Sequence, residues 1–126
     1  MSDKLLRIVR QSSIYAKIFC CNNYVEELME VLLFERNGIK SIDVRNRFSS
    51  HWKEMGKTLS KDEWRTVFNT FYNHSVFSKD SIHFKLTEAQ TPFYWFQKNG
   101  CDYWAVDKKR AWKWCKSRLS GLDLDV

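Results

Sequence analysis

The sequence contains little proline and little glycine, with one proline and four glycines among its 126 residues. This scarcity excludes a collagen-like chain and a flexible linker rich in these residues. The sequence also lacks any run of about 18 apolar residues, so no membrane-spanning helix is predicted. Residues 1–19 interrupt their apolar positions with basic side chains, unlike the apolar core of a secretory signal. We expect a cytoplasmic or nuclear protein without a membrane partner.

Motifs typical of metal centres and nucleotide hydrolysis are also missing. None of the four cysteines forms a C-x-x-C pair, and the three histidines add no zinc-ligand spacing. The four glycines are scattered, which excludes both the P-loop and the dinucleotide-binding glycine pattern. Adjacent Cys20 and Cys21 have no positioned base in the sequence. The sequence therefore predicts no cofactor, no metal site and no enzymatic activity.

Aromatic residues and positive charge are abundant. The chain has six tryptophans, five tyrosines and nine phenylalanines, and its net charge is +6. A hydrophobic content of 44% is enough for a buried core. The length predicts a single domain over residues 1–126, with an N-terminal helix in 1–22, a central unit in 23–97 and a basic C-terminal part in 98–126.

Apolar residues recur at helical spacing in five segments of the chain, beginning with Asp3–Phe19. A second helix is expected after Asn23, which can cap it together with Glu26, and Gly38 is expected to end it. A short third helix is expected from Ser41, its predicted cap.

The fourth and fifth predicted helices have clear start signals. Ser60 and Glu63 form a capping box ahead of a helix that extends to His74. Asp107 is expected to cap a final basic helix, which Gly121 ends. A short acidic tail follows that glycine.

The hydrophobic period changes between the fourth and fifth helices. Residues Ser81–Thr87 alternate between apolar and polar side chains, which predicts a half-exposed strand. In FYWFQKNGCDYWAV, the Asn99-Gly100 turn predicts a hairpin in which Lys98 faces Cys101. The sequence therefore predicts a three-stranded antiparallel β-meander within an α+β fold.

Both faces of the predicted hairpin are apolar, because successive side chains point to opposite sides of a strand. The two faces carry Tyr94, Phe96, Cys101 and Tyr103 on one side, and Phe93, Trp95, Trp104 and Val106 on the other. Three uses of Phe93, Trp95 and Trp104 remain open. They can fill the core between helices, stack unpaired bases beside basic residues, or anchor a protein partner.

The central helices and the strands after them resemble the winged helix-turn-helix superfamily at the level of the fold. The resemblance depends on the second, third and fourth predicted helices of the chain. They are a capped amphipathic helix, a short helix beginning KSIDV at Lys40, and a helix beginning SKDE at Ser60. The connection Lys53–Leu59, between the third and fourth predicted helices, is longer than the turn that is usual in helix-turn-helix pairs. The resemblance implies a winged-helix-like three-helix core and a β-meander wing, with extra N- and C-terminal helices, in a protein that binds double-stranded DNA.

In the family resembled, the helix after the turn enters the major groove of DNA. The outward residues of that helix include types that hydrogen-bond to base edges. These residues are Lys61, Arg65, Thr66, Asn69 and Asn73. Phosphate contacts are implied for Lys79 and Lys85 on the wing and for Arg45 and Arg47 on the preceding helix. The alternative is an ordinary polar helix face, and Asp62 and Glu63 at the same end would repel phosphate.

The basic C-terminal helix is a second candidate surface. Lys109, Lys113 and Lys116 lie at i, i+4 and i+7 and so form one stripe, which suits the phosphates of nucleic acid. A solvated helix face that aids solubility is the alternative. Pairing of the first helix with its copy would give a homodimer suited to a two-half-site operator.

The sequence favours a non-enzymatic protein that binds double-stranded DNA in the control of transcription or replication. The alternative is an inhibitor or adaptor module that binds a protein partner through the aromatic hairpin. The location of charge separates these hypotheses. One face shared by Arg65, Lys85 and Lys113 favours DNA, whereas dispersed charge beside a bare aromatic patch favours a protein interface.

Overall fold

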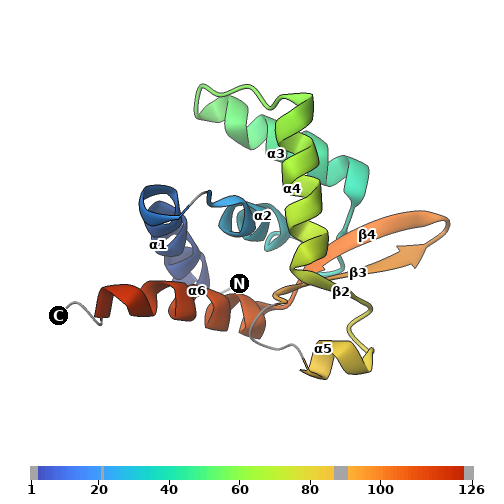
Figure 1. Cartoon of the computed structure of the whole chain (residues 1–126). Helices are drawn as coiled ribbons and strands as arrows, with labels where there is room; N and C mark the ends of the chain where they lie inside the picture. The colour runs from blue at the N-terminus through green and yellow to red at the C-terminus, as the bar shows by residue number, and fades with distance from the viewer. Residues whose placement is uncertain (1–2, 21, 87–90, 124–126) are drawn as a thin grey trace.

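A computed structural model describes residues 3–20, 22–86 and 91–123 of the chain. Within these residues the chain forms six helices and one four-stranded sheet (Figure 1). The helices and strands are separate rather than alternating regularly, so the predicted α+β class is confirmed.

The helices are α1 (Asp3–Phe19), α2 (Tyr24–Leu32), α3 (Ser41–Glu54), α4 (Lys61–Asn73), α5 (Ile82–Leu86) and α6 (Lys108–Asp123). The strands are β1 (Ile39–Lys40), β2 (Ser75–Phe77), β3 (Phe93–Lys98) and β4 (Cys101–Val106). The strands follow the order β1-β4-β3-β2 in the sheet. The pair β2 and β3 is parallel, and the other two pairs are antiparallel.

Two predicted helix starts are confirmed by their hydrogen bonds. The backbone N–H of Glu63 donates to Ser60 Oγ (3.1 Å), and the Ser60 hydroxyl donates to the Glu63 carboxylate (3.0 Å). Ser60 and Glu63 therefore start α4 as predicted, although the Glu63 carboxylate bonds the Ser60 hydroxyl rather than its backbone N–H. At the start of α6, the backbone N–H of Arg110 donates to the Asp107 carboxylate (3.1 Å).

Four other helix boundaries differ from the prediction. Helix α2 ends at Leu32, well before Gly38, which was expected to end it. The Asn23 side chain makes no capping hydrogen bond to α2, and its amide N–H donates to Ser13 Oγ of α1 (2.7 Å). Helix α3 already begins at Ser41, and its N-cap is Lys40, which enters the helix directly from β1. Helix α6 continues through Gly121, since a helical glycine costs only about 1 kcal/mol. The remaining tail residues, 124–126, lie outside the described residues.

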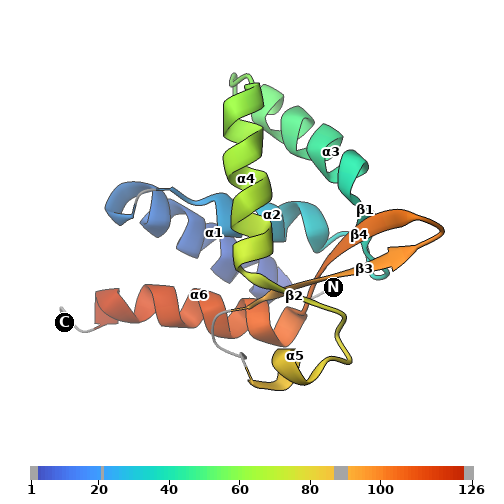
Figure 2. The ribbon, with the colours of Figure 1, turned by 45° about the vertical axis from the view of Figure 1, so that its right-hand side comes forward.

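The predicted β3–β4 hairpin is confirmed in its turn and its register. Asn99 and Gly100 both have positive φ, of 52° and 76°, as a two-residue hairpin turn requires. Lys98 is paired with Cys101, as predicted. Figures 1 and 2 show this hairpin extending outward from the helices, with its turn at the far end.

The predicted strand Ser81–Thr87 is wrong, because residues 82–86 form helix α5; Thr87 lies outside the described residues. The Ser81 hydroxyl oxygen accepts a hydrogen bond from the backbone N–H of Phe84 (3.2 Å), which favours a helical turn. The edge of β3 is occupied instead by β2, which follows α4 directly. The predicted antiparallel meander is therefore a four-stranded mixed sheet.

Helix α4 covers one face of the hairpin with aromatic side chains. Trp104 is fully buried and stacks on Phe71 with ring centroids 4.0 Å apart, and Phe71 also contacts Phe93 at 5.2 Å. The Trp104 indole N–H donates to the Tyr72 hydroxyl (3.0 Å). Burial raises the pKa of Tyr72; the bond from Trp104 lowers it, and nearby Asp102 raises it. Phe93 and Trp104 are thus core residues, as the first of the three predicted uses requires.

A buried ion pair joins α1, α2 and α6. The Glu26 carboxylate has no exposed surface and accepts hydrogen bonds from Arg118 Nε (2.9 Å), Arg118 Nη2 (2.9 Å) and Ser12 Oγ (2.6 Å). A buried charge is tolerated only where it is paired and hydrogen-bonded, so these three side chains fix the packing of the three helices. Figures 1 and 2 place α6 at the opposite end of the molecule from the start of α4.

Among the described residues, none of the helices combines the length and apolar character needed to cross a membrane.

Candidate nucleic-acid interface

The outward face of α4 is polar and exposed. Val67 and Phe71 are buried on its inner side. The five residues predicted to contact DNA are all exposed: Lys61, Arg65, Thr66, Asn69 and Asn73. Within the described part of the chain, neither Lys61 nor Arg65 forms an ion pair. Both cations are therefore available to an external anion.

The acidic residues at the start of α4 differ in their surroundings. The Glu63 carboxylate accepts the hydrogen bond of the N-cap, whereas Asp62 is exposed. The Thr66 hydroxyl donates to the backbone carbonyl of Asp62 (3.2 Å), so its proton is already used within the helix. The side chains of Arg65 and Asn69 make no hydrogen bond or ion pair with other described residues, so they are the stronger candidates for contacts with base edges on this face.

Arg45 and Arg47 of α3 lie in different environments. The guanidinium carbon of Arg45 is 5.9 Å from the ring centroid of Trp64, which belongs to the first turns of α4. Arg47 forms an ion pair with Glu35 (3.2 Å). Arg45 therefore extends the basic surface of α4, whereas Arg47 is neutralised by its partner.

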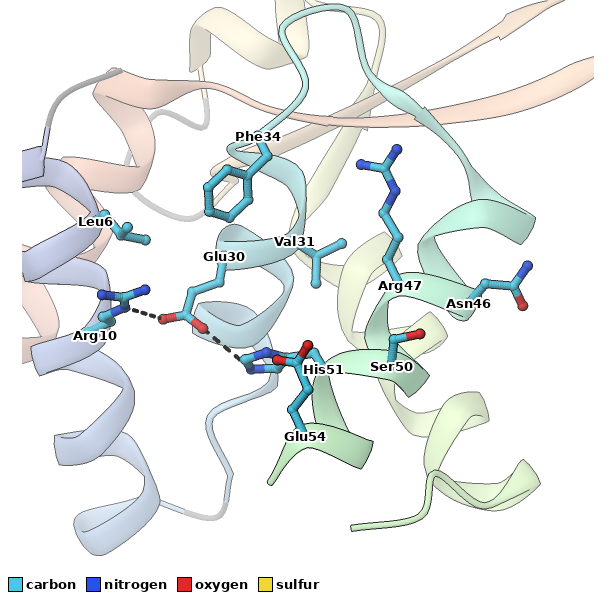
Figure 3. Close-up of a pocket in the computed structure, with 10 residues that line it drawn as sticks. All are labelled: Leu6, Arg10, Glu30, Val31, Phe34, Asn46, Arg47, Ser50, His51 and Glu54. Atoms are coloured by element: carbon cyan, nitrogen blue, oxygen red, sulfur yellow. Dashed lines mark hydrogen bonds and ion pairs between the residues drawn. The ribbon is translucent and has the colours of Figure 1, made fainter. Parts of the chain in front are cut away.

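Arg47 also borders a cavity of about 610 Å³ between α1, α2 and α3 (Figure 3). In this cavity the Glu30 carboxylate lies between Arg10 Nε (3.3 Å) and His51 Nε2 (3.4 Å). Ser50 lines the same cavity, but none of the hydrogen bonds among described residues joins it to His51. Among the described residues, the contacts of this cavity are thus centred on the Glu30 carboxylate.

Lys79 and Lys85 do not lie on a wing strand, because the expected strand is helix α5. Lys79 lies between β2 and α5 and pairs with Asp107 (3.3 Å), and Lys85 is part of α5. Both residues line a cavity of about 750 Å³ together with Lys109 of α6. The structure brings these three cations together and places α5 away from the start of α4 (Figures 1 and 2).

The predicted lysine stripe of α6 is divided between surfaces. Lys109 lines the cavity beside α5, and Lys113 is exposed on α6. Lys116 lines a groove between α1 and α6, with its ammonium 5.6 Å from the ring centroid of Trp112. The basic residues are therefore dispersed over the α4 face, the α5–α6 cavity and the α1–α6 groove. The single basic face of Arg65, Lys85 and Lys113, which was expected to favour DNA over a protein interface, is not formed.

Phe93 and Trp104 lie on the inner face of the hairpin, which α4 covers, and the half-exposed face is the opposite one. On the inner face, Trp95 is half-buried and packs against Tyr72 (5.5 Å between ring centroids) and Phe77 (4.7 Å). None of the three aromatic residues considered for stacking or for an interface is fully open.

Three half-buried aromatic rings line the opposite face of the hairpin, in an aromatic ladder of Tyr94, Phe96 and Tyr103. Their ring centroids are 6.3 Å and 5.4 Å apart, in that order. Gly38 passes close to the ladder, since a Cβ at this position would lie 3.2 Å from the Phe96 ring. Phe84 of α5 contacts the edge of Tyr94 at 6.0 Å. The ladder is therefore packed at Tyr94 and at Phe96, and its three rings remain half-exposed.

Arg36, Lys108 and Tyr94 line the α5–α6 cavity and were not among the site residues predicted from the sequence. One signal was present for Lys108, because Lys108 and Lys109 directly follow the Asp107 cap. Cations at a helix start oppose the helix dipole and give no structural benefit there. Such an arrangement indicates a use outside the helix itself.

Among the described residues, no group of three or more His, Cys, Asp or Glu side chains is placed to hold a metal ion. Comparison of the chain with protein-family models, with curated proteins and with solved structures found no match.

Proposed function

We propose that this protein is a non-enzymatic nucleic-acid-binding protein that binds double-stranded DNA through α4. The observation that carries the proposal is the exposed face of α4, where Arg65, Asn69 and Asn73 follow one another at helical spacing. Arg can bond guanine and Asn can bond adenine through two hydrogen bonds in the major groove. A role in the control of transcription or replication follows from such binding.

The arrangement of elements around α4 supports a winged-helix-like use of this face. Helices α2, α3 and α4 precede the β3–β4 hairpin, and β1 pairs with β4 through Ile39 and Trp104. The stack of Trp104 on Phe71 couples the hairpin to α4. A rigid connection of this kind would hold the helix and the wing in a fixed relation on a duplex.

The wing of this proposal is the β3–β4 hairpin itself. Lys98 is exposed beside its turn and forms no ion pair within the described residues. Lys98 and Arg45 would contact phosphates beside α4 and so position it without specifying a sequence.

Fluorescence anisotropy with a labelled random duplex of about 30 base pairs, roughly three helical turns, tests this proposal. We expect binding whose log affinity falls linearly with log salt, with a slope of about −0.9 for each phosphate neutralised. Absence of binding at low salt would contradict the proposal. Binding that does not depend on salt would contradict it as well.

Binding of a protein partner, as an inhibitor or adaptor, is the second candidate function. The hairpin offers few open rings for it, but the groove between α1 and α6 offers apolar side chains. Ile14, Ile18 and Phe19 are 63%, 65% and 66% exposed along α1, and Leu119 of α6 lines the same groove.

The charge around this groove suits an acidic partner. Within residues 4–19 and 108–120 there is no carboxylate, whereas ten side chains are basic. They are Lys4, Arg7, Arg10, Lys17, Lys108, Lys109, Arg110, Lys113, Lys116 and Arg118. Arg10 and Arg118 pair with Glu30 and Glu26, Arg110 is buried, and Lys108 and Lys109 line the α5–α6 cavity. Lys116 lines the groove itself, and Lys4, Arg7 and Lys17 are exposed on α1. A second copy of the chain would bring like charges together, so we propose an acidic amphipathic helix of another protein as the occupant.

This second function is tested with a labelled amphipathic model peptide, which as a helix carries leucine on one face and glutamate on the other. We expect it to bind more tightly than a scrambled peptide of the same composition, and we expect Ile18→Asp to remove the difference. Equal binding of both peptides would contradict a built groove. A dimeric mass in solution, lost in Ile18→Asp, would show instead that α1 pairs with its copy.

A further inference from the structure

The cavity between α5 and α6 has a strongly basic lining. The cavity has a volume of about 750 Å³ and is lined by six cations. These come from the α2–β1 connection, the β2–α5 turn, α5 and α6. They are Arg36, Lys79, Lys85, Lys108, Lys109 and Arg110. Three carboxylates also line it: Glu35, Asp80 and Asp107.

Two of these carboxylates are neutralised by specific partners. Glu35 pairs with Arg47, which lies outside the cavity, and Asp107 pairs with Lys79 while capping α6. Arg110 is buried, donates to Thr91 Oγ1 (2.9 Å) and lies 3.4 Å from the ring centroid of Phe84, so its role is structural.

Four exposed cations remain against the single carboxylate of Asp80. They are Arg36, Lys85, Lys108 and Lys109, and none of them forms an ion pair within the described residues. Because charges of one sign in a concave site focus the electrostatic potential, this cavity would attract an anion. The positive end of the α6 dipole acts in the same direction.

An aromatic surface adjoins these cations. Tyr94 lines the cavity and begins the aromatic ladder that continues through Phe96 to Tyr103. The Lys79 ammonium lies 5.9 Å from the Tyr94 ring centroid. Positively charged grooves set beside accessible rings are the means by which proteins hold single strands, since phosphates contact the cations and bases stack on the rings.

We propose that the α5–α6 cavity and the aromatic ladder bind an unpaired strand of nucleic acid. Its phosphates would contact Lys85, Lys108 and Lys109, and a base would stack against Tyr94. The proposal extends the nucleic-acid function proposed above to single strands, but it depends on residues distinct from those of α4. A partly unwound duplex could thus occupy both surfaces.

Anisotropy with a labelled oligothymidylate of about ten nucleotides measures this binding. We expect the double variant Lys85→Glu/Lys109→Glu to weaken it by about tenfold or more. The matched control is Lys4→Glu/Lys116→Glu, which changes the net charge equally on the α1–α6 surface and should retain the affinity. Equal losses in both variants would overturn the proposal, because they would show an effect of total charge alone.

The ring contact is tested by two substitutions at one position. Tyr94→Leu removes the flat ring but keeps an apolar side chain, and we expect affinity for the oligothymidylate to fall about fivefold. Tyr94→Phe keeps the ring and should bind like the unchanged protein. Unaltered affinity in Tyr94→Leu would exclude stacking on the ladder.

Arg65→Ala distinguishes this inference from the duplex proposal. It should weaken duplex binding and leave oligothymidylate binding unchanged. Loss of oligothymidylate affinity in Arg65→Ala, with no loss in the cavity variant, would assign single strands to α4 and overturn the inference. Oligothymidylate binding through the cavity without any duplex binding would support the inference while the duplex proposal fails.

Discussion

Trp104 of β4 lies flat on Phe71 of α4, with ring centroids 4.0 Å apart and ring planes inclined by 5°. Both side chains are completely buried. The neighbouring Tyr72 accepts the Trp104 indole hydrogen bond and donates to Asp102 (3.2 Å). This contact fixes α4 relative to the hairpin, and these are the two elements proposed to contact a duplex.

Phe71→Ala should therefore destabilise the fold strongly. We expect the free energy of unfolding to fall by about 3–5 kcal/mol, because a large buried ring is replaced by a cavity. Phe77→Ala is the matched control, since Phe77 is 54% exposed and contacts only the edge of Trp95 among the rings described. Its cost should be about 1 kcal/mol. Urea denaturation measures both, and similar costs would contradict the assigned core.

Gly38→Ala should destabilise more than Gly56→Ala. Both glycines have positive φ, of 86° and 75°, so both substitutions introduce backbone strain of about 1 kcal/mol. A Cβ at position 38 would also meet the Phe96 ring and the Trp104 carbonyl at 3.2 Å, whereas a Cβ at position 56 meets nothing within 4 Å. Thermal unfolding compares the two variants. Equal shifts would show that Phe96 moves away without cost.

Glu26→Gln should disrupt the packing of α1, α2 and α6. Burial lowers the pKa of Arg118, but the hydrogen bonds and charge of Glu26 outweigh this and raise it above its ordinary value. Removal of the carboxylate charge leaves the arginine uncompensated, and we expect a loss of about 3–5 kcal/mol. Glu54→Gln, on the exposed end of α3, should be nearly neutral. Denaturant titrations that give the same stability for both variants would contradict a buried ion pair.

Cys115 should be chemically inert in the folded protein. Burial raises the pKa of its thiol from 9.0 to about 12, with a further increase from the charge of Glu26. At about pH 8 the thiol stays protonated, and it should react with a thiol reagent only after unfolding. A variant with Cys20, Cys21 and Cys101 replaced by serine isolates this group. Rapid modification without denaturant would contradict its burial.

The same shift has a consequence for stability at high pH. The unfolded thiol ionises near its ordinary pKa of 9.0, whereas the folded one keeps its proton up to about pH 12. The contribution of the protonated Cys115 thiol to the free energy of unfolding is therefore fully present below pH 9.0 and is lost as the pH rises toward 12. In Cys115→Ala this contribution to the pH dependence should be absent.

Some elements of the fold could be predicted because their determinants are local. The capping box of Ser60 and Glu63 and the turn at Asn99-Gly100 each involve neighbouring residues only. Helix α5 could not be predicted in this way. Its alternating apolar residues suggested a strand, yet Ile82 and Leu86 are exposed, because neighbouring Phe84 alone packs inward.

The candidate site shows the same division. The exposure of Arg65 and Asn69 follows from the helical period of α4, which places them opposite buried Val67 and Phe71. The basic cavity could not be predicted, since it joins Arg36 to residues of α6 that are distant in sequence.

Arg65→Ala should weaken duplex binding by about 1–3 kcal/mol if the guanidinium bonds a base. Arg7→Ala is the matched control, because Arg7 is exposed on α1 and not on the face of α4 that is proposed to enter the major groove. The duplex affinities of the two variants are measured at one salt concentration and then over a series of salt concentrations. A loss that is equal in both variants would assign the effect to bulk charge.

Methylation interference tests the central claim most directly. A random duplex pool, partly methylated at guanine N7 on the floor of the major groove, is mixed with the protein, and bound and free fractions are separated. If α4 enters the major groove, the bound fraction should be depleted of N7-methylated guanines, since the added methyl groups block the atoms that Arg65 would bond. Equal methylation in bound and free DNA would contradict major-groove entry by α4.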